Sequence, residues 1–548
     1  MRVKNLIGAG ALALVLGGCG GGGTEQTPVR YGPIGGESGL ELADEQVLHR
    51  GNGTEPQTLD PHRAEGVPSS NILRDLFEGL VAEAPNGELI PGAAESWTIS
   101  EDGLTYTFIM RPDGRWSNGD PVTAFDFEFG LRRSADPETL SRYSSVLAPI
   151  RNAREVIAGE LPPEELGVEA VDERTFVIHL NAPTPYMLGL LTHSTCYAVH
   201  RGVVEQHGSD WSRVETHVGN GAYQLRDWVV QSHIHIERNP HYWDNYNTTI
   251  NEVYYYAIEN QDAELKRYRA DELDITATIP QKQLKWIRAN LAEEFRVTPY
   301  LGTYYFGFNT TRPPFAGNPE LRRALSLAVN RDIIARVVSG AGEPEAYSWI
   351  PPVRGYAQQV PEEAGWTQQQ REDEARRLYA EAGYSEDNPL TVEVLYNTSD
   401  NHKRIAIALR SMWKEVLGMD AALANQEWKV FLETRRSKTE TEIFRGGWIG
   451  DYEDAYTFAQ LLESTNEQND AGYVNARYDA LLAAASAEPD VALRAEYLQE
   501  AERLMLADQP ILPLYFYVTK RMVKPWVHGY EGNIMDHIYA RHLSILKH

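Results

Sequence analysis

The segment Arg445-Gly-Gly-Trp-Ile-Gly-Asp-Tyr452 concentrates glycine and aromatic residues in the C-terminal half of the chain. Glycine packs poorly inside a strand, and it often marks the close approach of another backbone. An extended ligand could therefore pair with this segment by strand addition. The same residues are equally compatible with a bulged edge strand whose Trp448 lies in the core. The segment alone leaves both interpretations open.

Predicted helices and strands alternate on either side of this segment. Alternating apolar and threonine residues predict a strand at 104–110, and Thr123 with Asp126 forms a capping-box pattern that predicts the start of a helix. Residues 168–180 are predicted to form a β-hairpin around a turn at 172–173. Further helices are predicted at 321–337, 367–382, 400–416 and 491–507, and further strands at 390–395 and 511–518. This succession indicates mixed α/β lobes.

Size and charge narrow the class of protein. The chain has 548 residues and a formal net charge of −27. A chain this acidic is not expected to bind nucleic acid, or to bind anionic lipid through its charge. Its length exceeds what one hydrophobic core usually holds, so two or three lobes are expected.

The N-terminal region has the layout of an export and anchoring segment. Arg2 and Lys4 precede an apolar run that ends in Leu16-Gly-Gly-Cys19. This pattern predicts a signal peptide at 1–18 and a lipidated Cys19, with 19–40 as a flexible tether. The apolar run is too short to span a bilayer, so we expect an extracytoplasmic protein held to a membrane through Cys19. The alternative is an ordinary signal peptide whose cleavage region contains a cysteine.

Motifs of common enzymes are absent from the chain. It has no His-Glu dipeptide, which excludes the zinc-protease helix motif, and no Gly-Lys dipeptide, which excludes a phosphate-binding P-loop. A Gly-x-Ser-x-Gly elbow is also missing. We therefore expect a binding protein and not an enzyme, with a secreted peptidase as one alternative.

Three possible metal ligands, His193, Cys196 and His200, lie within eight residues, and His233 and His235 share one face of a predicted strand. Their spacing matches no strong metal-binding pattern. Ordinary strand or loop histidines and a buried apolar thiol are the better interpretation. No metal and no cofactor is expected.

Motifs spread over the whole chain resemble one family, the extracytoplasmic oligopeptide-binding proteins of ABC peptide importers, which are family-5 solute-binding proteins. The motifs are Glu55-Pro-Gln-Thr-Leu-Asp-Pro61, Arg74-Asp-Leu-Phe-Glu-Gly-Leu80, Trp116-Ser-Asn-Gly-Asp-Pro-Val-Thr-Ala124, Gly219-Asn-Gly-Ala-Tyr223, Glu237-Arg-Asn-Pro-His-Tyr-Trp-Asp244, Tyr396-Asn-Thr-Ser-Asp400, Asn425-Gln-Glu-Trp-Lys429, Val523-Lys-Pro-Trp526 and Ile545-Leu-Lys-His548.

The resemblance implies an α/β fold like that of periplasmic binding proteins, with two hinged lobes plus an extra domain. Domain I would be discontinuous and gather residues 41–67, 201–301 and 518–548. Domain II would comprise 68–200, and domain III 302–517. The expected protein is a monomer that captures short peptides and delivers them to the permease subunits of an ABC transporter.

The resemblance also implies which residues bind the two ends of a peptide. Asp451 lies where relatives place the carboxylate that pairs with the α-ammonium group, which would select for a free amino terminus. Arg445, Arg435 and His402 resemble the positive groups that receive the peptide carboxylate, and a guanidinium group suits that role. The alternatives are an exposed acidic loop for Asp451 and a surface salt bridge for Arg435.

The remaining site residues implied by the resemblance contact the middle of the ligand. Gly447 and Trp448 would supply a backbone edge for main-chain pairing. The cleft would be lined by Glu55, Tyr143, Trp428 and Tyr517, for which packing in the core is the alternative.

Two departures from the family pattern bear on the cargo. Some relatives carry a disulfide between the positions of Gly302 and Ile449, and here both cysteines are absent together. The murein-peptide branch loses part of the basic set, so the presence of Arg435 and Arg445 favours ordinary peptides. Murein peptide, a nickel chelate or haem are alternative cargoes for the same fold.

Overall fold

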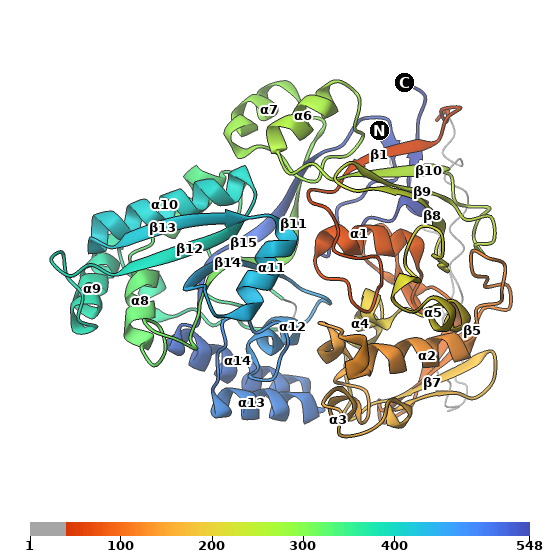
Figure 1. Cartoon of the computed structure of the whole chain (residues 1–548), viewed down its shortest axis with the longest axis horizontal. Helices are drawn as coiled ribbons and strands as arrows, with labels where there is room; N and C mark the ends of the chain where they lie inside the picture. The colour runs from red at the N-terminus through yellow and green to blue at the C-terminus, as the bar shows by residue number, and fades with distance from the viewer. Residues whose placement is uncertain (1–39, 354) are drawn as a thin grey trace, which may run out of the picture.

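The computed structural model describes residues 40–353 and 355–548, which form two lobes lying side by side (Figure 1). The first lobe contains helices α1 to α5, and the second contains α8 to α14. The expected signal peptide at 1–18, Cys19 and nearly all of the expected tether lie outside the described residues. No described helix has the length and apolar character needed to cross a membrane.

A four-stranded sheet lies at the end of the first lobe where the first described residues meet the C-terminal segment, through a bridge between Leu42 and Leu546. Its strands are β1 (Val47–Gly51), β8 (Tyr223–Val229), β9 (His233–Arg238) and β10 (Glu252–Tyr256). Their order is β1-β10-β9-β8, with β1 parallel to β10 and the other neighbours antiparallel. The C-terminal pair β16 (Val527–His528) and β17 (Ser544–Ile545) adjoins it, because Ala43 N donates to Ile545 O. Three separate parts of the chain meet here, as expected for domain I, whose boundaries stay a prediction.

A second four-stranded sheet fills the rest of the first lobe. It is antiparallel, in the order β4-β5-β7-β6, and α2 packs against β6 and β7. The strands of this region are β2 (Val81–Glu83), β3 (Leu89–Pro91), β4 (Ala94–Ile99), β5 (Thr105–Met110), β6 (Val168–Ala170) and β7 (Thr175–His179). The helices up to residue 290 are α1 (Val67–Leu76), α2 (Ala124–Ala135), α3 (Ala153–Ile157), α4 (Met187–Leu190), α5 (Arg201–His207), α6 (Gln261–Arg269) and α7 (Leu284–Asn290).

The second lobe is built on a five-stranded mixed sheet with the order β13-β12-β14-β11-β15. Its strands are β11 (Phe295–Phe308), β12 (Thr391–Asn397), β13 (Asp420–Gln426), β14 (Ile443–Ile449) and β15 (Ile511–Met522). Its helices are α8 (Pro319–Leu327), α9 (Gln368–Glu381), α10 (Asp400–Leu417), α11 (Trp428–Ser437), α12 (Tyr456–Ala459), α13 (Ala476–Ala487) and α14 (Val491–Asp508).

The long strands β11 and β15 connect the two lobes (Figure 1). They pair antiparallel from Phe295 and Met522 at one end to Gly307 and Ile511 at the other, with a break in register after Pro299. At the end near Met522 a bridge between Ile275 and Val523 ties them to the first lobe. A paired ribbon of this kind is a suitable hinge, because two strands with a local irregularity bend more readily than a packed interface.

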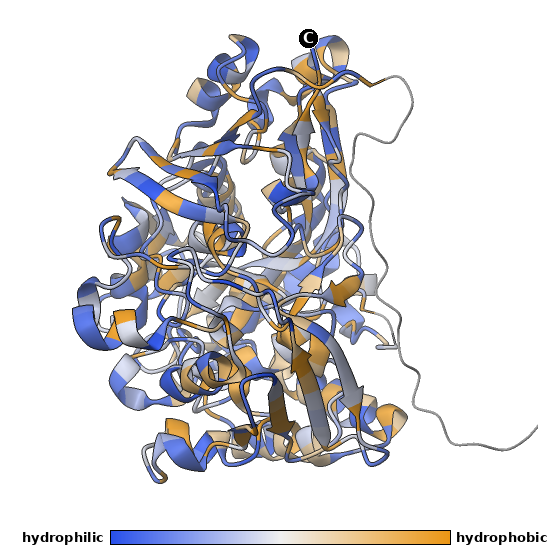
Figure 2. Cartoon of the chain, turned by 90° about the vertical axis from the view of Figure 1, so that its right-hand side faces the viewer, coloured by the Kyte–Doolittle hydropathy of each residue, from blue (hydrophilic) through white to orange (hydrophobic). Residues whose placement is uncertain are grey.

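Each lobe has its own apolar core. Residues such as Phe108, Phe127 and Ile236 form part of one buried cluster in the first lobe. Phe306 and Trp413 belong to a buried cluster of the second lobe. Figure 2 shows the outer helices largely in blue, which agrees with polar residues facing the solvent. Burial of separate cores explains how the lobes can keep their shape while their relative position changes.

Most local predictions are confirmed. The strand at 104–110, the hairpin at 168–180 and the helices at 367–382, 400–416 and 491–507 are present to within two residues. The capping box also forms, because Thr123 N donates to Asp126 Oδ2 at 2.7 Å. Local hydrogen bonds and local apolar spacing decide these elements, so the sequence alone could predict them.

The single helix predicted at 321–337 is wrong. Helix α8 ends at Leu327, and a separate π-helical segment spans Ile333–Ser339. Between them the buried side chain of Arg331 donates from Nε to Ala346 O at 3.0 Å and to Pro513 O at 2.9 Å. A guanidinium that satisfies two distant carbonyl groups is a tertiary constraint, and it overrides the local helical pattern.

The segment 445–452 is not an edge of the sheet as a whole. Strand β14 lies in the middle of the five, and its pairing with β11 runs from Ile443 to Ile449 without a register shift, so the expected bulge is absent from it. Gly302 faces Ile449 in this pairing. A Cβ on Gly302 would lie 2.5 Å from Ile449 Cδ1, which shows how closely the two positions pack.

Candidate functional site

A cavity of about 430 Å³ lies between the two lobes. The first lobe contributes the start of α1 together with Tyr143 and His193, and the second contributes residues 447–451 and Tyr517. This volume is in the range typical of sites that enclose a small ligand.

One edge of β14 faces this cavity without a partner strand. Strand β12 pairs with β14 only at Ile443 and Phe444, whereas β11 pairs along the whole opposite edge. Within residues 40–353 and 355–548 no strand pairs with the cavity side of β14 beyond Phe444. Gly447, Trp448 and Ile449 line the cavity there. An extended backbone can therefore add to this edge, as in other strand-addition sites.

The glycines of this strand are explained by rings packed against it. A Cβ on Gly446 would overlap the ring of Tyr305, its partner on β11. A Cβ on Gly447 would lie 2.5 Å from Tyr517 Oη and 2.9 Å from Arg445 Nη2. The interpretation that these glycines mark the approach of another backbone is thus incomplete, because side chains of neighbouring strands already require them.

Asp451 follows β14 directly and carries a buried carboxyl group. Its side chain is 9% exposed, and Thr457 Oγ1 donates to Asp451 Oδ2 at 3.2 Å. Burial raises the pKa of Asp451 to about 7, and the hydrogen bond from Thr457 opposes that shift only in part. The alternative of an exposed acidic loop residue is therefore wrong.

His193 is the basic residue nearest to this carboxyl group. Its Nε2 lies 3.6 Å from Asp451 Oδ1. Burial, together with the charges of Arg74 and His537, lowers the pKa of His193 to about 3, so the imidazole is neutral and supplies no counter-charge. Asp451 is consequently a carboxylate without a cation, and a ligand ammonium group would complete it.

Arg445 lies six residues before Asp451, on β14. Its Nη2 donates to Tyr517 Oη at 2.6 Å, and its guanidinium lies 4.8 Å from the centre of the Tyr304 ring. No carboxylate of the described chain is within ion-pair distance of it, and Arg445 lines the cavity. A ligand carboxylate could bind here through two parallel hydrogen bonds.

Arg435 also lines the cavity, but its charge is already matched. Its Nε lies 2.6 Å from Asp470 Oδ2, and the two side chains are 12% and 6% exposed. The surface salt bridge considered for Arg435 is therefore wrong, since the pair is buried. A peptide carboxylate could bind Arg435 only in competition with Asp470.

Two expected site residues lie outside the cavity lining. His402 is half-buried with Nδ1 3.1 Å from Tyr304 Oη, and loss of solvent around the ring lowers its pKa far below the usual value, so the ring is neutral here. Glu55 accepts from Gln231 N at 2.9 Å and from Trp228 Nε1, which makes it a structural residue of the first lobe. Neither residue lines the cavity in this structure, and their roles in ligand binding stay predictions.

Aromatic side chains close the cavity where the lobes meet. Tyr143 of the first lobe stacks against Trp448 of the second, with ring centres 6.1 Å apart. Trp428 begins α11 and also lines the cavity. Tyr186 and Tyr452 stack at 4.4 Å. These contacts cross from one lobe to the other, so they form only when the lobes are close together.

The possible metal ligands do not come together. Cys196 is buried, and His200 is the N-cap of α5 with its Nε2 2.9 Å from Asp120 Oδ2, whereas His193 faces Asp451. Among the described residues no group of three or more histidine, cysteine, aspartate or glutamate side chains is placed to hold a metal ion.

Some residues at the site could not be predicted from the sequence. Asp470 and Glu65, which pair with Arg435 and Arg436, are single acids far from their partners along the chain. The sequence contains no periodicity that would reveal such pairs. Arg74 begins one of the motifs that resemble the family, but nothing in the sequence distinguishes it from the other charged residues of that motif.

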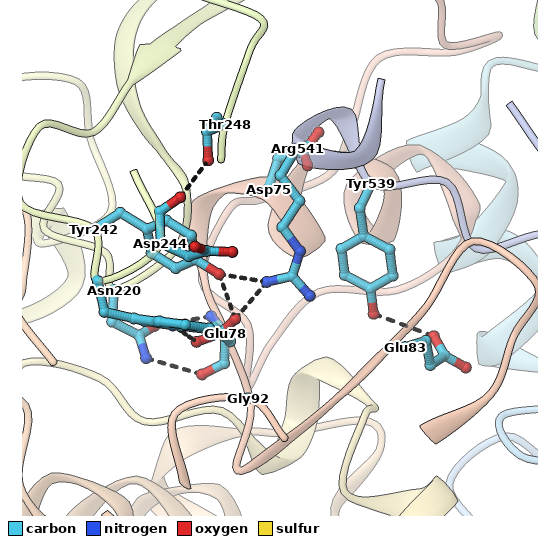
Figure 3. Close-up of polar contacts among 12 residues, drawn as sticks. Asp75, Glu78, Glu83, Gly92, Asn220, Tyr242, Asp244, Thr248, Tyr539 and Arg541 are labelled. Carbon is cyan, nitrogen blue, oxygen red and sulfur yellow. Dashed lines mark hydrogen bonds and ion pairs between the residues drawn. The ribbon is translucent and has the colours of Figure 1, made fainter. Parts of the chain in front are cut away.

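Those other charged residues have structural roles, which Figure 3 shows. Glu78 accepts from Tyr242 Oη at 2.6 Å, and Arg541 binds it as well. Asp75 accepts from Ala540 N at 2.9 Å. The acids of the motif therefore join α1 and the strand after it to the C-terminal segment, while Arg74 lines the cavity.

Comparison with known proteins identifies the family. The family of bacterial extracellular solute-binding proteins, family 5 (Middle), matches residues 88–470. The chain belongs to this family. It is 44% identical over 516 residues to the periplasmic oligopeptide-binding protein OppA of Salmonella typhimurium, covering 93% of this chain and 94% of that protein. The resemblance stated from the motifs and the expected fold class are thereby confirmed.

Solved structures of this family also indicate how the lobes are arranged. Haemophilus influenzae OppA in complex with the peptide RPPGFSPFR has a TM-score of 0.90 at 42% identity, covering 92% of this chain and all of that one. The Escherichia coli murein tripeptide binding protein MppA, over 92% of this chain and 100% of that one, also gives 0.90. An unliganded open form of MppA gives 0.66, over 93% and 99%. Both MppA structures are 38% identical to this chain, so the lower score reflects lobe arrangement, and the present lobes are arranged as in the peptide complex.

Proposed function

We propose that this protein is an extracytoplasmic receptor that encloses short peptides between its lobes and delivers them to an ABC transporter. The observation that carries the proposal is the placement of Arg445 and Asp451 at the two ends of the unpaired edge of β14, both facing one cavity. A free peptide is an extended chain with an ammonium group at one end and a carboxylate at the other. It matches this arrangement in backbone and in charge.

The spacing of the two charged residues suggests the size of the ligand. Six residue steps of about 3.3 Å put their α-carbons up to about 20 Å apart, and their side chains shorten the gap. An extended peptide of roughly three to five residues would bridge it. Because recognition rests on the main chain and the termini, many side chains would be accepted.

The relatives support a transport role. OppA of Salmonella typhimurium is named a periplasmic oligopeptide-binding protein. By analogy we place this chain outside the cytoplasm as a monomer that docks on permease subunits, held to a membrane by lipidated Cys19. Ion pairs between the two lobes, such as Arg436 with Glu65, suit a receptor whose lobes close on its ligand.

Calorimetry with modified peptides tests the proposal. Tri-alanine should bind to the purified protein, and N-acetylation should weaken binding by about 2–5 kcal/mol, since it leaves Asp451 without an ammonium partner. Amidation of the carboxyl end of the peptide should also weaken binding, because it removes the carboxylate that would pair with Arg445. Equal affinity for free and acetylated peptides would contradict the proposal. Mass spectrometry of ligand extracted from fresh protein would reveal a murein peptide, a nickel chelate or haem instead.

A further inference from the structure

The charged residues around the cavity divide into matched and unmatched groups. Arg435 pairs with Asp470, Arg521 with Asp536, and Lys520 with Glu343. These pairs need nothing from a ligand. Asp451 and Arg445 are unmatched, and the two termini of a peptide would satisfy them.

Arg74 is a further unmatched cation. It lies in the last turn of α1 and lines the cavity. Within the part of the chain that the structure describes, its guanidinium forms no ion pair and no hydrogen bond with another residue. Arg74 is half-buried, and a guanidinium that lines a cavity without a protein partner can bind an anionic group of a ligand through two hydrogen bonds.

The charge of Arg74 acts on neutral side chains and on one carboxylate, which already accepts hydrogen bonds from other residues. The charge of Arg74 contributes to the low pKa of His193 and to the lowered pKa of Glu83. Glu83, however, accepts from Tyr539 Oη at 3.1 Å and from His537 Nδ1, and it forms no ion pair with Arg74. Glu83 is therefore already bound to other donors.

The position of Arg74 also indicates which part of a peptide it faces. His193 lies 3.6 Å from Asp451, and both His193 and Arg74 line the first-lobe side of the cavity. The charge of Arg74 acts on His193, so we assign Arg74 to the end of the cavity that holds Asp451 and the amino terminus of an enclosed peptide.

We propose that Arg74 binds the carboxylate of an acidic side chain in the first or second residue of the enclosed peptide. The inference rests on the proposed function, because it requires a peptide held between Asp451 and Arg445. An aspartate or glutamate side chain would accept two hydrogen bonds from the guanidinium, and the closed cavity would strengthen them. The protein would then favour acidic peptides among those it captures.

A substitution scan with glutamate and glutamine tests the proposal. Tri-alanine is varied at each position to Glu or to Gln, and calorimetry gives the ratio of affinities for each pair. With wild-type protein we expect Glu to bind at least about tenfold more tightly than Gln at position one or two, and about equally at position three. In Arg74→Gln the ratio should fall to about one, and Arg74→Lys should restore part of it.

Arg63→Gln is the matched control. Arg63 is exposed and lies outside the cavity lining, and its substitution removes the same charge from the same lobe. Its Glu-to-Gln ratio should equal that of the wild type. If Arg63→Gln also lost the preference for Glu over Gln, the preference would come from the net charge of the protein and not from a contact with Arg74.

Three results would overturn the proposal. A wild-type ratio near one at positions one and two would do so even if Arg74→Gln failed to fold. Equal weakening of Glu and Gln peptides by Arg74→Gln would show that the guanidinium binds the peptide backbone. If no tripeptide bound at all, the proposed function would fall with it. Normal binding of tri-alanine with no acidic preference would remove this inference alone.

Discussion

The residues from Arg445 to Asp451 and the group Arg435, Arg436, Glu65 and Asp470 adjoin the same cavity, yet their charges are arranged in opposite ways. In the first region the two ionisable side chains have no partner of opposite charge. In the second, Arg435 pairs with Asp470 within the second lobe, and Arg436 pairs with Glu65 across the lobes. Buried charges left unmatched require a ligand, whereas matched ones hold the walls of the site together.

Removal of the Asp451 carboxylate should have the largest effect on binding. Asp451→Ala and Asp451→Asn should each weaken tripeptide affinity by about 2–5 kcal/mol, because the α-ammonium group would be enclosed without a counter-charge. Calorimetry on both variants measures this loss. Asp451→Asn keeps the shape of the side chain, so a loss confined to Asp451→Ala would point to packing and would break the comparison between the two regions.

The pH dependence of affinity should be the next largest effect. Burial raises the pKa of Asp451 to about 7, and the peptide ammonium group binds only the ionised carboxylate. Below pH 7 a proton must first leave, so affinity should fall by up to about tenfold per pH unit. Above about pH 8 the peptide amino group loses its own proton, and affinity should fall again. Calorimetry in buffers of different ionisation enthalpy would detect the released proton at pH 6 to 7.

The stability of the peptide-free protein gives an independent check of this pKa. An acid whose pKa is raised on folding destabilises the native state by an amount that is complete above the folded pKa, and this effect fades as the pH falls from the folded pKa toward the unfolded value of about 4. Asp451→Asn should therefore melt at a higher temperature than the wild type at pH 8, and the difference should shrink as the pH falls and be nearly gone at about pH 4. His193, with a pKa of about 3, stays neutral throughout this range and does not produce the profile. A wild-type affinity that is flat between pH 5.5 and 7 would contradict the assignment.

The sequence predicted those features that depend on local contacts. The capping box of Thr123 and Asp126 joins residues three positions apart, and Asp451, singled out by the family resemblance, lines the cavity. Features made by residues distant in the chain were missed. Arg331 ends a helix by binding Pro513 O, and Asp470 neutralises Arg435 from another loop. Neither contact leaves a periodic or compositional signal in the sequence.

His402 and Glu55 show a related limit. Glu55 lies in a motif that resembles the family and His402 follows another, but a motif does not say which way a side chain faces. His402 turns toward Tyr304, and Glu55 binds Gln231 N within the first lobe. Burial and partners decide whether a charged residue serves the ligand or the fold, and these become known only from the packed structure.

The smallest expected effect comes from the matched region, and it concerns ligand length. Asp470→Asn would release Arg435 from its ion pair and give the cavity another free guanidinium. A peptide whose carboxylate lies closer to Arg435 than to Arg445 should then bind a few-fold more tightly, by about 1 kcal/mol, since part of the gain is offset by loss of the pair. Calorimetry with tri-, tetra- and penta-alanine would show a change in the preferred length.

Asp387→Asn is the control for this change, because Asp387 is exposed and lies outside the cavity lining. It should leave the order of affinities across peptide lengths as in the wild type. If Asp470→Asn weakened all three lengths equally, Asp470 would be holding the cavity wall in place and not masking Arg435. If it left every affinity unchanged, the buried pair would have no part in selecting ligands, and the contrast between matched and unmatched charges would apply to Asp451 and Arg445 alone.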